Sequence, residues 1–204
     1  MTITNRSDKN TVDCDKFIGD RTEISLREWS DNDPVLYDDE IEYSFDFLMT
    51  DIDKCVGGSG ELPYAWSMIS QIHQTGLTTQ MHPAFELTLR GNDPSFRELH
   101  IGRTTEASHP WYVPQHIVNI SRDTWYSIKV EAKFSEDGYV RVYINGVKVY
   151  EDAEPTAYSL TSSMGVGSKL VNGKRVADVR VGLYESAGTT KYTLRLKNLN
   201  FMHI

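Results

Sequence analysis

The chain has 204 residues, of which 39% are hydrophobic, and its formal net charge at pH 7 is −8. These values suit one packed core and are low for two, so we expect a single domain spanning residues 1–204. The acidic balance argues against a protein that coats nucleic acid, because neutralising phosphates requires a basic face. No window of the sequence approaches the roughly 18 apolar residues of a membrane span, so we expect no membrane partner.

The N-terminal residues are polar, and we expect residues 1–15 to be flexible or to form an extended lead-in strand. The opening segment, MTITNRSDKN, lacks the charged-then-apolar layout of a secretory signal. A signal already removed, export by another route and retention inside the cell stay open as alternatives. We favour an extracellular or virion-associated location over the cytoplasm.

Short alternating runs separated by glycine and proline predict an all-β chain. The candidate strands are residues 21–29, 40–49, 65–75, 85–90, 98–103, 124–134, 138–144, 147–152, 176–186 and 192–203. Asn145 and Gly146 lie between two of these runs and predict a tight hairpin, because this pair tolerates positive φ at both turn positions. So many strands without a helix predict an antiparallel β-sandwich, a jelly roll of the concanavalin A-like kind.

Two long connections interrupt the predicted strands. Residues 51–63 are rich in glycine, and residues 102–123 contain two prolines. Loops of this length in a compact sandwich often line a binding site.

The cysteines and acidic segments do not predict a metal site. Cys14 and Cys55 lack the companion Cys or His ligands of a zinc site, and we favour two free thiols over a disulfide between them. Residues 37–40 (YDDE) could hold a structural calcium ion, but the ligand spacing of an EF-hand is absent. We therefore expect no metal and no organic cofactor.

The polar faces of four predicted strands collect unusual side chains. Successive side chains alternate across a strand, so each strand divides into two faces. The polar sets are Arg21, Glu23, Ser25 and Arg27; Ser67, Ile69, Gln71 and His73; Glu86, Thr88 and Arg90; and Asp178, Arg180, Gly182 and Tyr184. If these strands share one sheet, the combined face has the composition of a site. An ordinary solvated sheet face is the alternative, because any half-buried strand alternates in this way.

Three segments carry a resemblance to a known family. In order, RTEISL, QIH and VRVGLYE resemble the R-T/S-E-L-R, Q-I/V-H and Y-F-K-A-G-x-Y segments of jelly-roll polysaccharide lyases, above all the alginate lyases of family seven. Residues 125–152 also resemble a hairpin of the heparin lyase and glucuronan lyase group. The resemblance reaches from about residue 21 to the end of the chain.

The resemblance carries over to the chain position by position. The matched residues are Arg21, Glu23, Gln71, His73 and Tyr184, and Arg180 stands where the family's lysine is found. Ser25 replaces the second arginine of the first segment, although Arg27 is expected on the same face, and Asp178 replaces the tyrosine that opens the third segment. These departures bear on the substrate class more than on the chemistry.

The resemblance implies cleavage of a uronic acid polymer by β-elimination. Gln71 and a guanidinium from Arg21 or Arg180 would stabilise the charge that develops on the uronate, an effect of roughly 3–4 kcal/mol per donor. His73 or Tyr184 would take the C5 proton, and Tyr184 would protonate the leaving oxygen. Tyr184 needs a nearby cation to act as a base, and Arg180 is the expected source. The expected substrate-binding residues are Glu23, Arg27, Arg90, Arg180 and Trp111, with Trp111 either stacking on a sugar or anchoring its loop.

Other functions fit the sequence less well. A glycoside hydrolase needs two carboxylates across the scissile bond, and the compact E-x-D-x-x-E strand typical of sandwich hydrolases is absent. A G-x-S-x-G nucleophile motif is absent as well. The remaining histidines, His100 among them, have no partner at metal-ligand spacing and are expected to be surface or structural residues. A non-catalytic carbohydrate-binding or virion attachment domain is the main alternative, because a fold does not determine a function.

Overall fold

The computed structural model describes residues 2–4, 21–27, 33–53, 66–74, 83–90, 96–103, 114–135, 137–152, 170–171, 173–185 and 191–204. Within these ranges the chain is all-β. The strands are β1 (Thr2–Thr4), β2 (Arg21–Arg27), β3 (Val35–Leu36), β4 (Glu40–Asp53), β5 (Trp66–Gln74), β6 (Phe85–Arg90), β7 (Phe96–Arg103), β8 (Pro114–Ser121), β9 (Trp125–Lys133), β10 (Tyr139–Ile144), β11 (Val147–Asp152), β12 (Leu170–Val171), β13 (Lys174–Glu185) and β14 (Lys191–His203). Within the same ranges no helix is long and apolar enough to cross a membrane.

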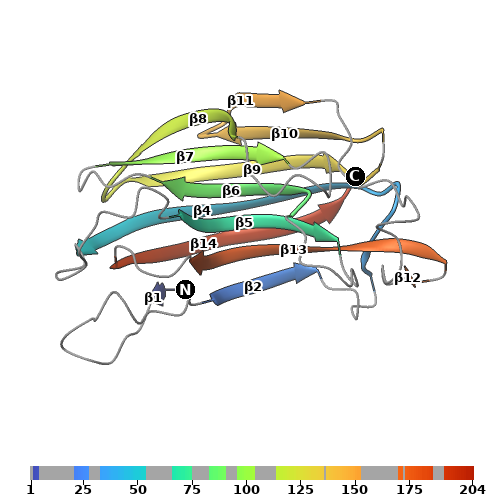
Figure 1. Ribbon diagram of the computed structural model, residues 1–204, viewed down its shortest axis with the longest axis horizontal. Coiled ribbons are helices and arrows are strands. Elements are labelled where there is room, and N and C mark those ends of the chain that lie inside the picture. The colour runs from blue at the N-terminus through green and yellow to red at the C-terminus, as the bar shows by residue number, and fades with distance from the viewer. Residues whose placement is uncertain are drawn as a thin grey trace.

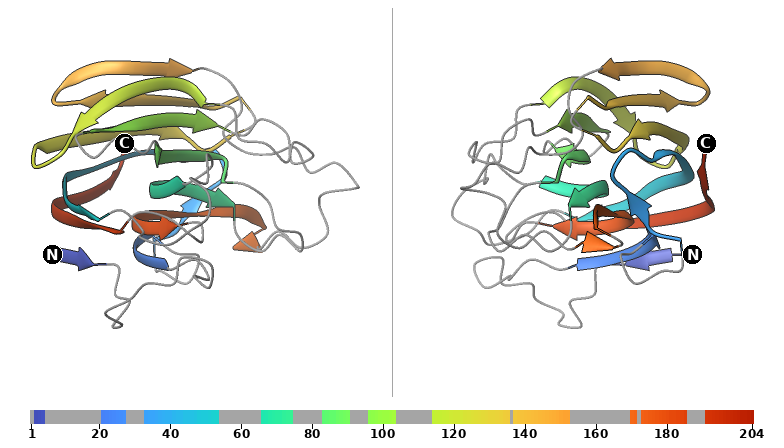
Figure 2. Two further views of the ribbon diagram at one scale, coloured as in Figure 1. Left: turned by 60° about the vertical axis from the view of Figure 1, so that its left-hand side comes forward. Right: turned by 90° about the vertical axis from the view of Figure 1, so that its right-hand side faces the viewer.

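The strands form two antiparallel sheets that pack face to face. The six-stranded sheet has the order β1-β14-β4-β9-β10-β11, and the eight-stranded sheet has the order β12-β13-β5-β6-β7-β8, with β2 and β3 also paired to β13. Most of the long strands run along the longest axis of the molecule (Figure 1). Figure 2 separates the layers, with β5 and β6 on one side and β4 and β14 on the other. The predicted antiparallel β-sandwich is confirmed.

The core lies between the sheets and takes alternate residues from each strand. In β10 the apolar residues of YVRVYI are buried, and the residues between them are partly exposed. Phe45 and Phe47 of β4 are fully buried, and the Phe47 ring stacks on Tyr126 of β9 with 5.7 Å between ring centroids. Burying each large apolar side chain contributes about 1.5–3 kcal/mol. The alternation in the sequence therefore determines which face of each sheet meets the other sheet.

One polar contact crosses this core. The Tyr43 hydroxyl of β4 lies 2.9 Å from Ser70 Oγ of β5, and both residues are fully buried. Desolvation raises the pKa of Tyr43 well above its ordinary value, so the hydroxyl stays neutral. This hydrogen bond joins the two sheets directly behind the strand that carries Gln71 and His73.

The hairpin between β10 and β11 forms at the predicted pair. Asn145 has φ 51° and Gly146 has φ 79°, as a two-residue turn of this kind requires. Asn145 Oδ1 also accepts a hydrogen bond of 2.9 Å from the Ser127 amide of β9. The turn therefore anchors three neighbouring strands in register.

Every predicted strand is present, with ends that differ by a few residues. Among the described residues, β1 lies within the expected lead-in, and β3, β8 and β12 were not predicted. Residues 114–121, expected within a long connection, form β8, an edge strand that begins at Pro114. Proline is tolerated at the first residue of an edge strand because its missing N–H is not needed there. Pro114 therefore begins a strand and does not mark a loop. Of the expected lead-in, Thr2–Thr4 pair with β14, and the rest of residues 1–15 lies outside the described residues.

Candidate active site

Strand β13 is the centre of the site because it pairs with β5 on one side and with β2 on the other. Its sequence DVRVGLYE places Val179, Val181 and Leu183 in the core. The alternate residues therefore point away from the core. We call this outward face of the eight-stranded sheet the site face; its central residues are Glu23, Gln71, Glu86, Asp178 and Arg180.

Strand β5 does not keep the simple alternation that its sequence predicts. Between Met68 and Ser70 it contains an extra residue relative to β6, a β-bulge. Ile69 is fully buried in the core cluster, and Ser67 pairs with the buried Leu89. The prediction that Ser67 and Ile69 share a face with Gln71 is therefore wrong. Beyond the bulge Gln71 does point outward, because it pairs with Arg180 of β13 and Glu86 of β6.

The site face is not an ordinary solvated sheet surface. Gln71, Glu86, Thr88 and Asp178 point away from the core, yet each is 3% exposed or less. Polar side chains that are buried in this way need partners, because an unpaired buried polar group costs about 1–3 kcal/mol. The Arg180 side chain is 25% exposed. The solvated-face alternative therefore fails for these central residues.

A hydrogen-bonded network joins three strands on the site face. Gln71 Nε2 of β5 donates to Glu23 Oε1 of β2 at 2.5 Å. The guanidinium of Arg180 donates to Asp178 Oδ2 at 2.7 Å, and its other terminal nitrogen lies 3.9 Å from Glu23 Oε2. Both carboxylates are almost fully buried, with side chains 4% and 3% exposed for Glu23 and Asp178. The two carboxylates hold the guanidinium in place, and Glu23 also orients the Gln71 amide.

The network leaves polar atoms available for a ligand. Arg180 Nε and Ser25 Oγ are buried and have no hydrogen-bond partner within the described part of the chain. Ser25 of β2 is the register partner of Arg180. A donor and an acceptor therefore lie on neighbouring strands beside the Gln71 amide.

Gly182 makes room for this network. Glu23 and Gln71 lie on the two strands that flank β13, so about 10 Å, two strand spacings, separates their backbones. Gly182 is the register partner of Glu23 and carries no side chain to stand between them. Its φ of 153° also favours glycine, since residues with a Cβ rarely adopt it. The glycine of the VRVGLYE segment thus allows side chains from β2 and β5 to meet over β13.

A family model described as polysaccharide lyase matches residues 1–195. The chain belongs to the polysaccharide lyase family. The resemblance inferred from three short segments is therefore confirmed, and with it the prediction that the protein is a lyase. No curated protein matches the sequence of this lyase.

Solved structures share the fold of this lyase at low sequence identity. A glucuronan lyase from the fungus Trichoderma reesei superposes with a TM-score of 0.56 at 15% identity, covering 90% of this chain and 74% of its own. An alginate lyase from Pseudomonas aeruginosa superposes with a TM-score of 0.59 at 13% identity, with the same coverage of 90% and 74%. The alginate lyase AlyC3 has a TM-score of 0.57 at 10% identity, covering 92% of this chain and 72% of its own.

The two candidate proton-transfer residues of the lyase flank its central network. His73 pairs with Asp178, and Tyr184 pairs with Met68. Along β5, five positions separate Met68, the partner of Tyr184, from His73. This separation is about 17 Å of extended strand. Gln71 and Arg180 lie between these two levels. Both side chains are partly exposed, and they must lean along their strands to approach one sugar.

The remaining predicted site residues of the lyase differ in their placement. Arg90 lies on the site face in register with Glu98 of β7. Arg21 pairs with Tyr184, but its side chain is not among the described residues. Trp111 lies outside the described residues altogether. Cys14 and Cys55 do as well.

Arg27 does not share the face of Arg180, contrary to prediction. A bulge between Val179 and Arg180 makes Arg27 the partner of Val179, whose side chain is in the core. The guanidinium of Arg27 lies 4.3 Å from the ring centroid of Phe201 on the six-stranded sheet, and 4.0 Å from Asp33 Oδ2. The extra residue turns Arg27 toward the other sheet, so Arg27 closes an edge of the sandwich instead of lining the site face.

Glu98 and His100 of β7 extend the site face beyond the predicted set. Thr88 Oγ1 donates to Glu86 at 3.1 Å, and His100 Nε2 lies 2.8 Å from Glu98 Oε2. His100 pairs with Thr88 and is only 7% exposed, so it is not a surface residue. Glu98 and His100 are two positions apart, and the alternation argument used for the other strands would have found them.

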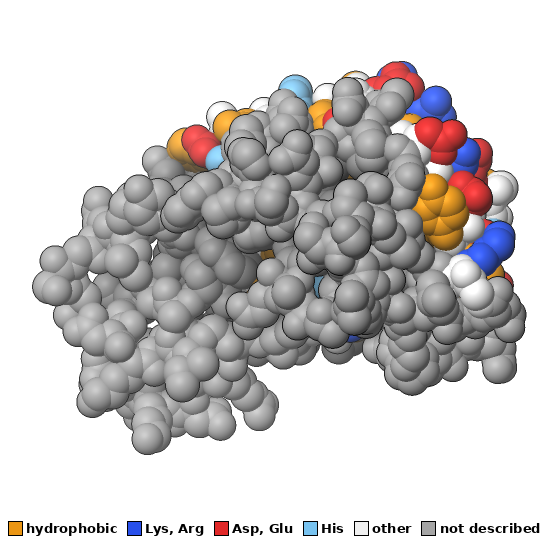
Figure 3. Space-filling model, turned by 45° about the vertical axis from the view of Figure 1, so that its right-hand side comes forward, with side chains coloured by type: hydrophobic (Ala, Val, Ile, Leu, Met, Phe, Trp, Pro, Cys, Tyr) orange, Lys and Arg blue, Asp and Glu red, His pale blue; other side chains and the backbone are white. Residues whose placement is uncertain are grey.

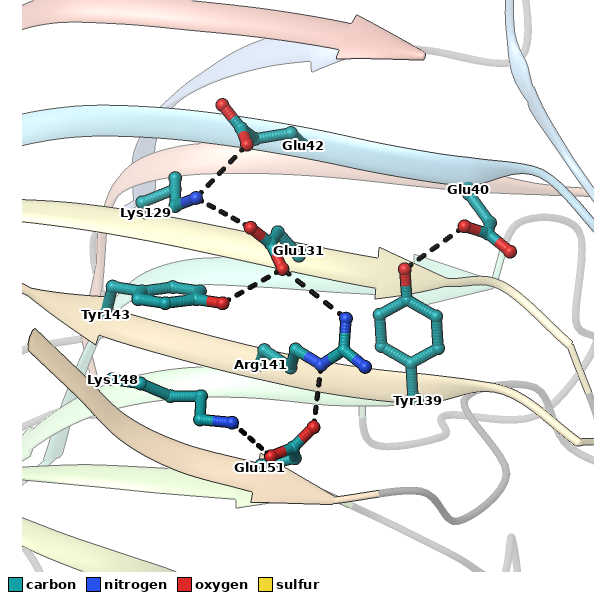
Figure 4. A network of polar contacts seen from close by, with 9 residues as sticks. All are labelled: Glu40, Glu42, Lys129, Glu131, Tyr139, Arg141, Tyr143, Lys148 and Glu151. Carbon is teal, nitrogen blue, oxygen red and sulfur yellow. Dashed lines mark hydrogen bonds and ion pairs between the residues drawn. The ribbon is translucent and has the colours of Figure 1, made fainter. Parts of the chain in front are cut away.

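The outward face of the six-stranded sheet has a different character. Acidic and basic side chains are interspersed along the upper right edge of Figure 3. In Figure 4 a chain of contacts crosses β4, β9, β10 and β11. Glu131 lies 2.6 Å from Lys129 Nζ, 3.1 Å from the Tyr143 hydroxyl and 3.6 Å from Arg141. These contacts lower the pKa of Glu131, chiefly through the hydrogen bond from Lys129. Lys129 and Arg141 on this face are therefore paired with carboxylates of the neighbouring strands.

The described residues contain no group of three or more His, Cys, Asp or Glu side chains that could hold a metal ion. In residues 37–40, Asp39 Oδ2 accepts a hydrogen bond of 2.7 Å from the Leu36 amide. Asp38 has φ 76°, which places it in a turn. The Asp39 carboxylate therefore stabilises the turn between β3 and β4.

Proposed function

We propose that this lyase cleaves a uronate-containing anionic polysaccharide by β-elimination on the site face. The observation that carries the proposal is the network of Gln71, Glu23, Asp178 and Arg180, which holds an amide and a guanidinium in fixed positions on the site face. Fixed donors of this kind stabilise developing negative charge without reorganising during the reaction.

The uronate carboxylate is the group that needs these donors. Removing the C5 proton places additional negative charge on a group that already carries one. The second amide hydrogen of Gln71 is available to offset it, and so is Arg180 Nε, which has no hydrogen-bond partner among the described residues. One such donor contributes about 3–4 kcal/mol to catalysis. The partly exposed Arg180 side chain marks where a sugar would reach the network.

We assign the proton transfers to His73 and Tyr184. Two carboxylates already compensate Arg180, so it is a weak source of positive field for turning the Tyr184 phenol into a base. A neutral imidazole is a base at physiological pH without such help. His73 therefore takes the C5 proton, and Tyr184 protonates the departing O4. The chain segment being cleaved lies over Gln71 and Arg180, between the two levels.

The test is the ultraviolet absorbance of the unsaturated uronate product, measured on alginate, glucuronan, hyaluronan and heparin-type polymers. His73→Ala and Tyr184→Phe should each lower kcat on the cleaved polymer by at least about a hundredfold, the usual contribution of a positioned acid or base. A His73→Ala enzyme with near wild-type kcat would show that Tyr184 performs both transfers. Binding without cleavage of any polymer would support the carbohydrate-binding alternative.

A further inference from the structure

Glu86 is a buried acid on the site face that the proposed chemistry does not use. It lies on β6 between Gln71 of β5 and Gly102 of β7, its partners in register. Its side chain points away from the core, yet the residue is 3% exposed. The Thr88 hydroxyl donates to its carboxylate at 3.1 Å. Glu86 therefore lies on one side of Gln71, and Glu23, which orients the Gln71 amide, lies on the other side.

The charges around Glu86 do not fully neutralise it. On its own strand the cation is Arg90. Burial outweighs Arg90 and the Thr88 hydrogen bond, and raises the pKa of Glu86 from 4.5 to about 7. From β5 the neutral Gln71 faces it, with His73 further along the strand, and from β7 Gly102 faces it.

The other charged groups near Glu86 are engaged with one another. His100, two positions from Gly102 on β7, is held by Glu98. Beyond Gln71, the Arg180 charge is shared between Glu23 and Asp178. An ionised Glu86 would thus add a negative charge beside the place where a uronate carboxylate is bound.

We propose that Glu86 takes up a proton when the polysaccharide binds, so that a neutral carboxylic acid lies beside the substrate carboxylate. The proposal rests on the proposed function and adds a charge-setting residue to it. Two carboxylates close together cannot both ionise without a large penalty, so the bound anion raises the proton affinity of the acid. By linkage, the proton raises the affinity for the anion by the same factor.

The expected pH dependence follows from the sign of this linkage. Below neutral pH Glu86 is already protonated, so binding needs no proton and the affinity is independent of this group. Above neutral pH each binding event must draw a proton from solvent, and Kd rises by up to about tenfold per pH unit. His73 and His100 also lie on the site face near Glu86. A variant at position 86 is needed to separate these contributions.

The experiment measures proton uptake on binding in the Tyr184→Phe background, in which turnover is expected to be at least about a hundredfold slower. Alginate and glucuronan oligosaccharides are titrated calorimetrically at pH 7.5 in two buffers of different ionisation enthalpy. The Tyr184→Phe enzyme should take up a fraction of a proton for each oligosaccharide bound. This proton uptake should be smaller in the double variant Tyr184→Phe/Glu86→Gln. The rise in Kd between pH 6 and pH 8 should flatten in the same double variant, because glutamine mimics the neutral acid at every pH.

A second measurement observes the Glu86 carboxyl itself, so the test does not depend on whether the Glu86→Gln variant folds. Infrared difference spectra of the Tyr184→Phe enzyme at pH 7.5 should show a protonated-carboxyl band when oligosaccharide is added. Equal proton uptake with and without Glu86, or no such band, would overturn the role of Glu86 and leave the proposed function intact. Failure of the Tyr184→Phe enzyme to bind, together with a wild type that cleaves no polymer, would overturn the proposed function itself.

Discussion

Gly182→Ala tests whether the meeting of Glu23 and Gln71 over β13 matters for catalysis. The substitution adds a Cβ beside Glu23, the register partner of Gly182, and forces a residue with a side chain to adopt φ 153°. The backbone strain should lower the free energy of unfolding by about 1–3 kcal/mol. Loss of the Gln71–Glu23 hydrogen bond, which has a charged acceptor, corresponds to about 1.5–3 kcal/mol. The expected fall in kcat/KM is therefore about 10- to 100-fold.

Gly146→Ala is the matched control. Gly146 also has a positive φ, 79°, and a Cβ added there would meet nothing within 4 Å. It lies in the β10–β11 turn, far from the site face in the fold, so the variant should lose similar stability while kcat/KM stays unchanged. Urea unfolding and initial rates on the cleaved polymer measure both quantities. If both variants lose stability but neither loses activity, the Glu23–Gln71 contact is structural and the proposed role of Gln71 is wrong.

Three further predictions use other contacts. Asp178→Asn removes one of the two carboxylates that hold Arg180. The value of kcat/KM should fall by about tenfold, which corresponds to the low end of the energy of one charge-assisted hydrogen bond. The free energy of unfolding in urea should change less. Tyr43→Phe leaves the buried Ser70 hydroxyl without its partner and should lower the free energy of unfolding by about 1–3 kcal/mol at unchanged kcat, with a smaller additional loss in Tyr43→Phe/Ser70→Ala. The folded-state pKa of Glu131 is lowered, so its ionised form stabilises the fold above its ordinary pKa and this stabilisation disappears as the pH falls through the lowered value. Wild type and Glu131→Gln should therefore differ in urea stability at pH 7 and converge in acid, and polymer cleavage at pH 7 should be the same in both.

Alternation in the sequence predicts a face only where a strand is regular. It correctly placed Asp178, Arg180 and Tyr184 opposite the core residues of β13. It failed at Ile69 and Arg27, because each lies at or just beyond a bulge that shifts every later side chain by one position. A bulge depends on how two distant strands pair, and this information is not local in the sequence.

The contacts across strands were also beyond the sequence. The motifs indicated that Glu23 and Gln71 share a site, but only the strand order shows that their strands flank β13, across which the two side chains meet. The proximity of Glu86 to Gln71 follows from register, and alternation alone does not predict its low exposure on an outward face. The strand β8 was missed because Pro114 was taken as a loop signal, although an edge strand can begin with proline.

Strand β13 supplies Asp178, Arg180, Gly182 and Tyr184 at every second position, and this arrangement limits how the enzyme can evolve. An insertion or deletion of one residue in this strand would reverse the orientation of all the positions beyond it, sending charged groups inward and valines outward. Exchange of residue type at a fixed length has no such effect. Divergence among lyases of this shape toward new polymers should therefore accumulate in β13 as point substitutions at even-numbered positions, with changes of chain length confined to other segments.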